Sequence, residues 1–521
     1  MSRKAIACLL PLAIGLLACP AARAGLSDQT PGGLPAETAS PGPATPTMSI
    51  ATIIERAESG DAQSQELLGE LYASGNGVPT DLGQAVTWIG KAAGQNHPHA
   101  LYYLGLLTYL GRGVPQNTGK AMALFNQAAI AGDRDGERSL AIALQTGDGV
   151  PHDDARAMSW FFRAAQHGDA ASQFLVYQHF VQGVGILRDD VQGLRWLEAA
   201  ARQRVPLAEV RYGLSFESGL GGQVQDDNQA VHWLEVGLVD LERLAQLPPE
   251  RRFFTQAAID ETIADGAVEL GWLIYNGREP THDFDHARRL LLQASERGSA
   301  QAASILGDIF YLGKLGQPDI VEATKWYRTA AERGWVAAMT RLGTIFETGQ
   351  GLERDLPQAL VWFQKGADKN DPLAQESLGR LYWFGTDGLA ADHAAAVRWF
   401  EKAAANGRPW AQSMLALAYR TGDGLVADQA KALDWARKAA VQGDAMAENT
   451  VGYALLIGRD VPPDAKEACV WLQLAYERAA PGELRYRASI NLDNSRALLS
   501  PQENETCSAQ AAAWRARLPP K

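Results

Sequence analysis

A glycine that recurs mostly every 36 residues is the feature that most constrains this sequence. It stands at one fixed place in each segment, seven residues after an apolar core position: Gly75, Gly111, Gly147, Gly183, Gly219, Gly277, Gly313, Gly349, Gly385, Gly422 and Gly458. A period of this size indicates an array of identical supersecondary units that stack on their neighbours. Because such an array presents a long surface, binding is the first functional hypothesis and catalysis needs separate evidence.

Residues 61–96 contain one such unit. Apolar residues at helical spacing between Leu67 and Tyr72 predict an amphipathic helix, which Gly75 closes in the left-handed conformation. A Gly-Val-Pro turn follows, and Asp81 is placed to cap the free N–H groups of a second helix. Since the other units carry the same signals, the sequence predicts an all-α chain of helix–turn–helix repeats.

The second helix of most units carries a tryptophan, with a small residue three positions before it. The tryptophans are Trp88, Trp160, Trp196, Trp233, Trp326, Trp362, Trp399, Trp435 and Trp471, and leucine stands at this place in the two other units. One helix pair cannot bury its apolar face alone, so neighbouring units must complete the core. We therefore interpret these tryptophans as core residues that pack against small side chains, and not as a ligand-binding site.

The unit at residues 62–93 reads Ala-x5-Leu-Gly-x-Leu-Tyr-x2-Gly-x-Gly-Val-Pro-x-Asp-x3-Ala-x2-Trp-x3-Ala-Ala. This pattern resembles the Sel1-like repeat (SLR), a relative of the tetratricopeptide repeat. The units at 97–132, 133–168, 371–407, 408–443 and 444–479 match it closely, and those at 205–237 and 266–298 depart from it most. The resemblance implies an α/α superhelical solenoid of about eleven repeats with terminal caps.

The resemblance also implies a function. Similar proteins are scaffolds for protein complexes, and bacterial exported members are implicated in envelope assembly, exopolysaccharide export and host contact. We expect an exported, non-enzymatic scaffold that binds a protein partner in the cell envelope through a concave surface lined by the first helices. Two alternatives stay open. One is a polysaccharide- or peptidoglycan-binding component of an exopolysaccharide secretion or cell-wall assembly machine, and the other is a cell-wall hydrolase or penicillin-interacting enzyme.

The first 24 residues have the features of a signal peptide. Arg3 and Lys4 precede the apolar run Ile6–Ala18, and Ala22-Arg23-Ala24 forms a small-x-small cleavage site. The apolar run is too short to span a membrane. We expect a periplasmic or secreted protein; the alternative is an outer-membrane lipoprotein anchored through Cys19.

Composition divides the rest of the chain. Residues 25–48, rich in proline and glycine, are predicted to be a disordered linker. We then expect an N-terminal capping helix at 49–60, repeats 1–5 at 61–237, a helical insertion at 238–265, repeats 6–11 at 266–479 and a C-terminal helical cap at 480–521. The insertion is either an elongated helical hairpin packed on the repeats or a protruding partner-binding element.

The net charge limits the kinds of binding partner, and the cysteine content bears on disulfide formation. The formal net charge is −12, and residues 1–24 hold three basic and no acidic side chains, which leaves −15 without them. This balance argues against nucleic acid as a partner and favours basic or neutral ones. Outside the targeting segment only Cys469 and Cys507 remain, and we expect a disulfide between them, the alternative being one buried and one exposed thiol.

Motifs of catalysis and cofactor binding are missing from the sequence. It contains no P-loop, no His-Glu-x-x-His, no Gly-x-Ser-x-Gly and no Cys-x-x-Cys. His282 and His286 lie four residues apart, but Asp283 between them occupies a helix-cap position, so we assign no metal site there. We interpret His97 and His99 as solvated loop residues. The prediction is no catalytic residue, no cofactor and no metal.

Aromatic residues that break the repeat pattern are the candidates for partner binding. Several fall on first helices outside the packing stripe, where exposed aromatics would act as binding hot spots or as platforms for sugar stacking. The alternative is that they fill gaps between units. The candidates are Tyr102, Tyr109, Phe174, Trp272, Tyr311, Trp335, Trp383 and Trp410.

Overall fold

The computed structural model describes residues 48–249, 252–278, 283–386 and 388–517. Within these ranges the chain forms consecutive α-helices joined by short turns, and no helix there is both long and apolar enough to cross a membrane. The predicted signal peptide, the linker up to residue 47, Cys19, His282 and the last four residues lie outside the described residues. The chain divides into two compact units between Ser299 and Ala300, and each is described by itself.

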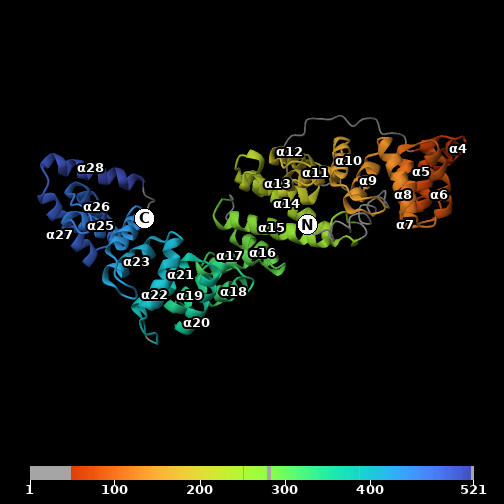
Figure 1. The fold of residues 1–521 in the computed structure, drawn as a ribbon. Coiled ribbons are helices and arrows are strands. Elements are labelled where there is room, and N and C mark those ends of the chain that lie inside the picture. Colours follow the sequence, from red (N-terminus) through yellow and green to blue (C-terminus); the bar gives the residue numbers. More distant parts are fainter. Residues whose placement is uncertain (1–47, 250–251, 279–282, 387, 518–521) are drawn as a thin grey trace. The chain divides into compact units, whose positions relative to one another are not determined.

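Among the described residues, the first unit contains thirteen α-helices and a short 3-10 helix at Leu220–Gly222; the α-helices are labelled in Figure 1. A capping helix, α4 (Ile50–Glu58), precedes the repeats. The repeat helices are α5 (Ala62–Ser74), α6 (Leu82–Gly94), α7 (Pro98–Leu110), α8 (Thr118–Ile130), α9 (Arg134–Thr146), α10 (Asp154–Gln166), α11 (Ala170–Gln182), α12 (Asp190–Arg202), α13 (Pro206–Ser218), α14 (Asp227–Gln246), α15 (Gln256–Tyr275) and α16 (Phe284–Glu296). Odd-numbered helices are the first helices of their repeats, and each packs on the even-numbered helix that follows it.

The second unit continues this pairing. Its helices are α17 (Ala300–Tyr311), α18 (Ile320–Glu332), α19 (Val336–Thr348), α20 (Leu356–Asp368), α21 (Pro372–Phe384), α22 (His393–Ala405), α23 (Pro409–Thr421), α24 (Gln429–Ala440), α25 (Ala445–Ile457), α26 (Ala465–Arg478), α27 (Glu483–Ala497) and α28 (Pro501–Arg517). The last two form the C-terminal cap, packed on α26. With its two-helix repeats in both units, the chain is an all-α solenoid protein.

The local signals of the repeat act as predicted. The Asp81 side chain accepts a hydrogen bond of 3.0 Å from the Gln84 N–H at the start of α6, and an Asp or Asn does the same at the start of the second helix in every other repeat. Gly75 closes α5 with φ 77°, a left-handed conformation that favours glycine. These contacts are local, which is why the sequence alone reveals them.

The centre of each repeat is the residue after the tryptophan position. In α20, Phe363 is completely buried, and a Cβ on Gly343 of α19 would lie 2.5 Å from its ring. Gly307 in α17 and Gly379 in α21 face Tyr327 and Phe400 with the same spacing. The glycine of the first helix therefore makes room for the largest core side chain of the second.

The tryptophans pack against the core, as predicted, but most of them lie at its edge and not at its centre. Only Trp362 and Trp471 are buried, and the other seven are half-buried at the edge of the core. The Lys91 ammonium lies 3.5 Å above the Trp88 ring centre, and a Lys or Arg three residues after Trp160, Trp362, Trp399 and Trp435 covers the ring in the same way. Because a helix turns by about 100° per residue, the core position falls one residue later.

Buried polar side chains join successive repeats. Gln65 donates to the Ala57 carbonyl at 3.0 Å and accepts a hydrogen bond of 2.8 Å from Gln95 of the following helix. The same double contact recurs at Gln173, Gln375 and Gln412. In the fifth repeat a glutamate, Glu209, takes this place and is completely buried.

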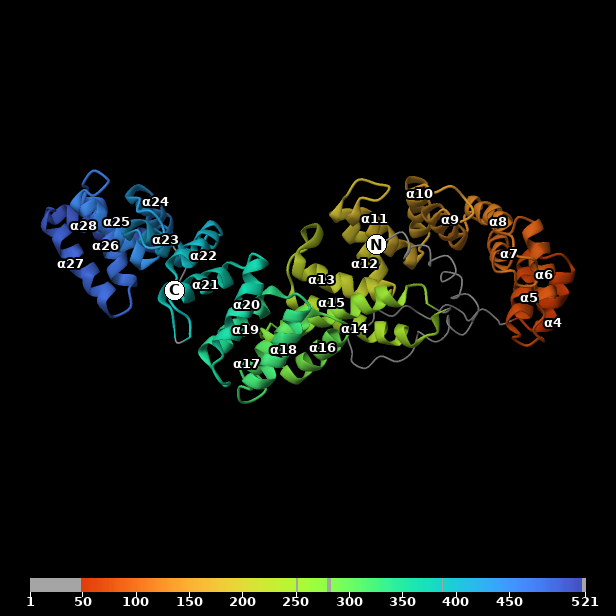
Figure 2. The same ribbon diagram turned by 60° about the horizontal axis from the view of Figure 1, so that its bottom comes forward.

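The inserted residues lengthen two repeat helices. Helices α14 and α15 each have 20 residues, against 13 in most others, and lie side by side (Figure 2). The loop between them carries Phe253 and Phe254, which are 5% and 9% exposed. Phe254 meets Phe174 of α11 edge-on at 5.5 Å, and the Arg138 guanidinium of α9 lies 6.0 Å from the Phe253 ring centre. The insertion therefore folds back onto first helices of its own unit.

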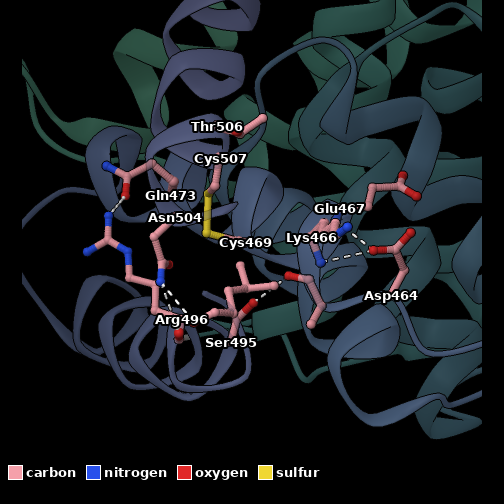
Figure 3. The surroundings of a disulfide bond; sticks show 12 residues. Asp464, Lys466, Glu467, Cys469, Gln473, Ser495, Arg496, Asn504, Thr506 and Cys507 are labelled. Atoms are coloured by element: carbon pink, nitrogen blue, oxygen red, sulfur yellow. Dashed lines mark hydrogen bonds between the residues drawn. A yellow bond between two sulfur atoms is a disulfide. The ribbon is translucent and has the colours of Figure 1, made fainter. Parts of the chain in front are cut away.

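A disulfide fixes the C-terminal cap. Cys469 of α26 and Cys507 of α28 are joined with a Cα–Cα distance of 6.0 Å, and both are buried (Figure 3). Beside the bond, Arg496 donates to Gln473 at 2.6 Å, and the Asn504 amide donates to the Arg496 carbonyl at 3.2 Å (Figure 3). The cross-link therefore holds the last helix on the last repeat.

Candidate functional site

Three of the eight aromatic candidates are interior residues. Tyr102 and Phe174 are 0% and 2% exposed, and Trp383 is 8% exposed. Trp383 stacks on His393 with ring centres 4.5 Å apart and packs on Phe400. A side chain closed off from solvent cannot contact a partner, so the assignment of these three to a binding surface was wrong. They fill the space between neighbouring helices.

The other five candidates are half-buried. The Tyr109 hydroxyl donates to Asp148 at 2.7 Å, and the Tyr311 hydroxyl donates to Gln350 at 2.7 Å; both contacts run to the turn of the next repeat. Arg278 lies over the ring of Trp272, while Trp335 and Trp410 pack at the edge of buried clusters. These aromatic residues connect repeats, and none of them offers a fully exposed ring.

An acidic hollow lies on the first helices of repeats 1–3 in the first unit. It has a volume of about 340 Å³. Helix α5 contributes Gln63, Glu66, Leu67 and Glu70, α7 contributes His99, and the start of α9 contributes Asp133, Arg134 and Asp135. Four carboxylates therefore surround one imidazole and one guanidinium, and the site attracts cations.

His99 lies at the centre of this hollow. Its Nδ1 is 3.1 Å from Asp133 Oδ2, and its Nε2 is 3.6 Å from Glu66 Oε1 and 3.9 Å from Glu70 Oε1. Burial by itself lowers the pKa of His99, but the hydrogen bond and charge of Asp133, together with the charge of Glu66, raise it to about 9. His99 is therefore protonated at neutral pH, and its positive charge offsets the surrounding carboxylates.

Buried charges continue from the hollow along α9. Arg138 is 7% exposed; it donates to Asp135 at 2.6 Å and also pairs with Asp169, the residue that caps α11. Burial lowers the pKa of Arg138, yet the charges of Asp169 and Asp135 outweigh it and the net shift is upward. This ion network fixes α9 against α11 beneath the loop that carries Phe253.

The interpretation of His97 and His99 as solvated loop residues was wrong. His97 is the cap residue before α7, and its Nδ1 is 3.1 Å from Glu66; His99 is in the first turn of α7. The repeat itself held the missed signal. Gln63, His99 and Asp135 are spaced by 36 residues and occupy one position in successive units, so stacking brings them together.

Comparison with known protein families identifies the repeated helix pairs. The Sel1 repeat model matches eleven segments, which are residues 62–97, 98–133, 135–169, 178–205, 206–236, 264–299, 300–335, 336–371, 372–407, 411–444 and 445–479. The chain belongs to the Sel1 repeat family. Sel1 repeat proteins are generally non-catalytic scaffolds for protein interactions, so the family identifies the kind of function and leaves the partner open.

One solved structure agrees with the Sel1 fold over most of the chain. A protective antigen present in uropathogenic Escherichia coli strains, c5321, which displays an SLR fold, is 28% identical, with a TM-score of 0.64 over 90% of this chain and 94% of the antigen. A Sel1 repeat protein from Oxalobacter formigenes is 22% identical and matches 58% of this chain and 96% of its own, with a TM-score of 0.31. A search of curated proteins finds no significant match.

Proposed function

We propose that this protein is an exported, non-enzymatic scaffold that binds a protein partner in the cell envelope. Three observations support export: the signal-peptide pattern of residues 1–24, the similarity to the antigen of uropathogenic strains, and the buried disulfide between Cys469 and Cys507. Structural disulfides persist in oxidising compartments such as the periplasm. A soluble periplasmic or secreted form is the proposal, and lipidation at Cys19 is the alternative.

The first-helix face of repeats 1–3, around the acidic hollow, is the proposed binding surface. The hollow is the observation that carries this assignment, because its charged side chains stand on packed helices and need little ordering when a partner binds. Its excess of carboxylates suits a partner segment of positive or neutral charge. Farther along the same face, the loop with Phe253 and Phe254 already covers α9 and α11.

Polysaccharide binding is the less favoured alternative. Aromatic platforms for sugars need a ring face open to solvent. The eight aromatic candidates are buried or half-buried and packed in contacts between repeats. At these positions we therefore favour a protein partner over a glycan.

Photo-crosslinking in living cells tests the proposal. A crosslinking amino acid replaces either Gln63, an exposed residue lining the hollow, or Thr87, an exposed residue of α6 in the same repeat. We expect a discrete protein adduct from position 63 and none from position 87. Equal adducts at both positions would contradict the assigned surface, and glycan without protein in the adduct would favour the polysaccharide alternative.

A further inference from the structure

We propose that the acidic hollow binds a divalent transition-metal ion through Glu66, Glu70 and His99. The proposal concerns the chemistry of these side chains and does not depend on the identity of a protein partner. It also revises the expectation, drawn from the sequence, that no metal site exists.

The three groups converge from two helices. Glu66 and Glu70 are four residues apart on α5, which places both carboxylates on one face of the helix. His99 reaches the same point from the first turn of α7, and one ligand atom of each residue lies within 4.8 Å of the others. Ligands bound about 2.1 Å from a tetrahedral ion lie about 3.4 Å apart. The observed 3.6 Å and 3.9 Å from His99 Nε2 to the carboxylates need only small side-chain movements.

Asp133 supplies the outer support that a histidine ligand requires. Its Oδ2 lies 3.1 Å from His99 Nδ1, on the side of the ring that faces away from Glu66 and Glu70. In the metal-bound form Nδ1–H donates to this carboxylate, which fixes the tautomer and leaves the Nε2 lone pair for the ion. Asp133 is itself fixed, because its other oxygen caps the start of α9 through the Gly136 N–H at 2.7 Å.

The carboxylates of the hollow favour a cation at this point. Glu66, Asp133 and Asp135 are each at least nine-tenths buried, and Glu70 completes the ring of carboxylates. Arg138 pairs with Asp135 and His97 lies 3.1 Å from Glu66, and a divalent ion held by Glu66, Glu70 and His99 would add to these positive charges.

Tyr102 gives a second, independent indication of a ligand. The residue is 0% exposed, and its hydroxyl has no hydrogen-bond partner among the described residues. The ring centre of Tyr102 lies 5.5 Å from that of His99, the residue that both possible ligand groups of the hollow share. Buried polar groups are normally hydrogen-bonded, and a water held by a bound ion would supply the missing partner.

The donor set selects the class of metal. One imidazole nitrogen and two carboxylate oxygens suit zinc, manganese, iron, cobalt or nickel, whereas calcium and magnesium prefer oxygen alone. Three protein ligands leave at least one coordination position for water. Zinc is the probe of choice because it has no redox chemistry.

Calorimetric titration of zinc into the tag-free protein, stripped with a chelator, tests the site. We expect one ion per chain with micromolar affinity. His99→Gln should weaken binding at least tenfold. Glu70→Gln should do the same, and since the Glu70 side chain is 42% exposed, this variant is expected to fold.

A histidine outside the hollow provides the matched control. The His152 side chain is 46% exposed at the turn before α10 and pairs with Asp154. His152→Gln should bind zinc like the unaltered protein. Zinc affinity weaker than about millimolar would overturn the proposal. An affinity that stays unchanged in the folded His99→Gln or Glu70→Gln variant would overturn it as well.

Discussion

Reduction of the disulfide between Cys469 and Cys507 should release the last helix, α28. The cross-link closes a loop between residues 38 positions apart. In the chain-entropy relation, a loop of this length restricts the open state by about 4 kcal/mol. Cys507 and Ala511 are the only buried residues of α28, which also packs Trp514 on Trp471 and pairs Arg515 with Glu477 at 2.9 Å. Since few of its residues are buried, we expect the cross-link to be the main restraint on its detachment.

Hydrogen exchange measures this release directly. Each 1.4 kcal/mol is a factor of ten in an equilibrium constant, so about 4 kcal/mol corresponds to a loss of protection of roughly a thousandfold in α28. Amides of α5, in the other unit, serve as the internal reference and should not change. Comparing the oxidised and reduced forms of one protein avoids the cavity that a substitution would leave, because a buried thiol packs as a small apolar group.

A cysteine-free variant controls for the reductant. Cys469→Ala with Cys507→Ala should show fast exchange in α28 with or without reductant. If α28 of the unaltered protein stays protected after full reduction, then packing and not the cross-link holds the cap, and the reasoning fails. A response of the cysteine-free variant to reductant would show that the reagent acts elsewhere.

The remaining predictions concern stability, measured by denaturant unfolding. Trp383→Ala should lower the free energy of unfolding by about 3–5 kcal/mol because the ring is buried. Phe384→Ala, at a side chain that is 64% exposed, should change it by no more than about 0.5 kcal/mol, and equal effects of the two substitutions would contradict the burial of Trp383. Gly343→Ala should lower the free energy of unfolding by about 1–3 kcal/mol because the new Cβ would lie 2.5 Å from a buried ring. At Gly90 a Cβ would meet nothing within 4 Å, so Gly90→Ala should raise the free energy of unfolding by up to about 1 kcal/mol. An unchanged stability of Gly343→Ala would refute the close approach of the two helices. Burial raises the pKa of Glu209 from 4.5 to about 7, so the folded state binds this proton more tightly than the unfolded state does. The contribution of Glu209 to the free energy of unfolding should therefore fall as the pH rises from 4.5 to about 7. Glu209→Gln should remove this pH dependence, and an unchanged pH dependence would assign it to other groups.

Much of the fold could be predicted from the sequence because its signals are local. The Asp81 cap and the Gly75 turn act within a few residues of their own positions, and repetition makes each signal visible eleven times. The pairing of Cys469 with Cys507 followed from counting, since no other cysteines lie outside the targeting segment. Local backbone chemistry thus determined the helices, their order and the repeat family.

The tertiary structure decided which side chains remain accessible. The core position proved to be Phe363 and its equivalents, one residue after the tryptophans, because accessibility depends on the angle at which two helices pack. The acidic hollow exists because stacking brings His99 beside Glu66 and Asp133, and the loop with Phe253 covers α9, which lies more than a hundred residues earlier in the chain. The 36-residue spacing of Gln63, His99 and Asp135 brings one helix position of successive repeats together, but only the packed structure shows which part of the first-helix face stays open.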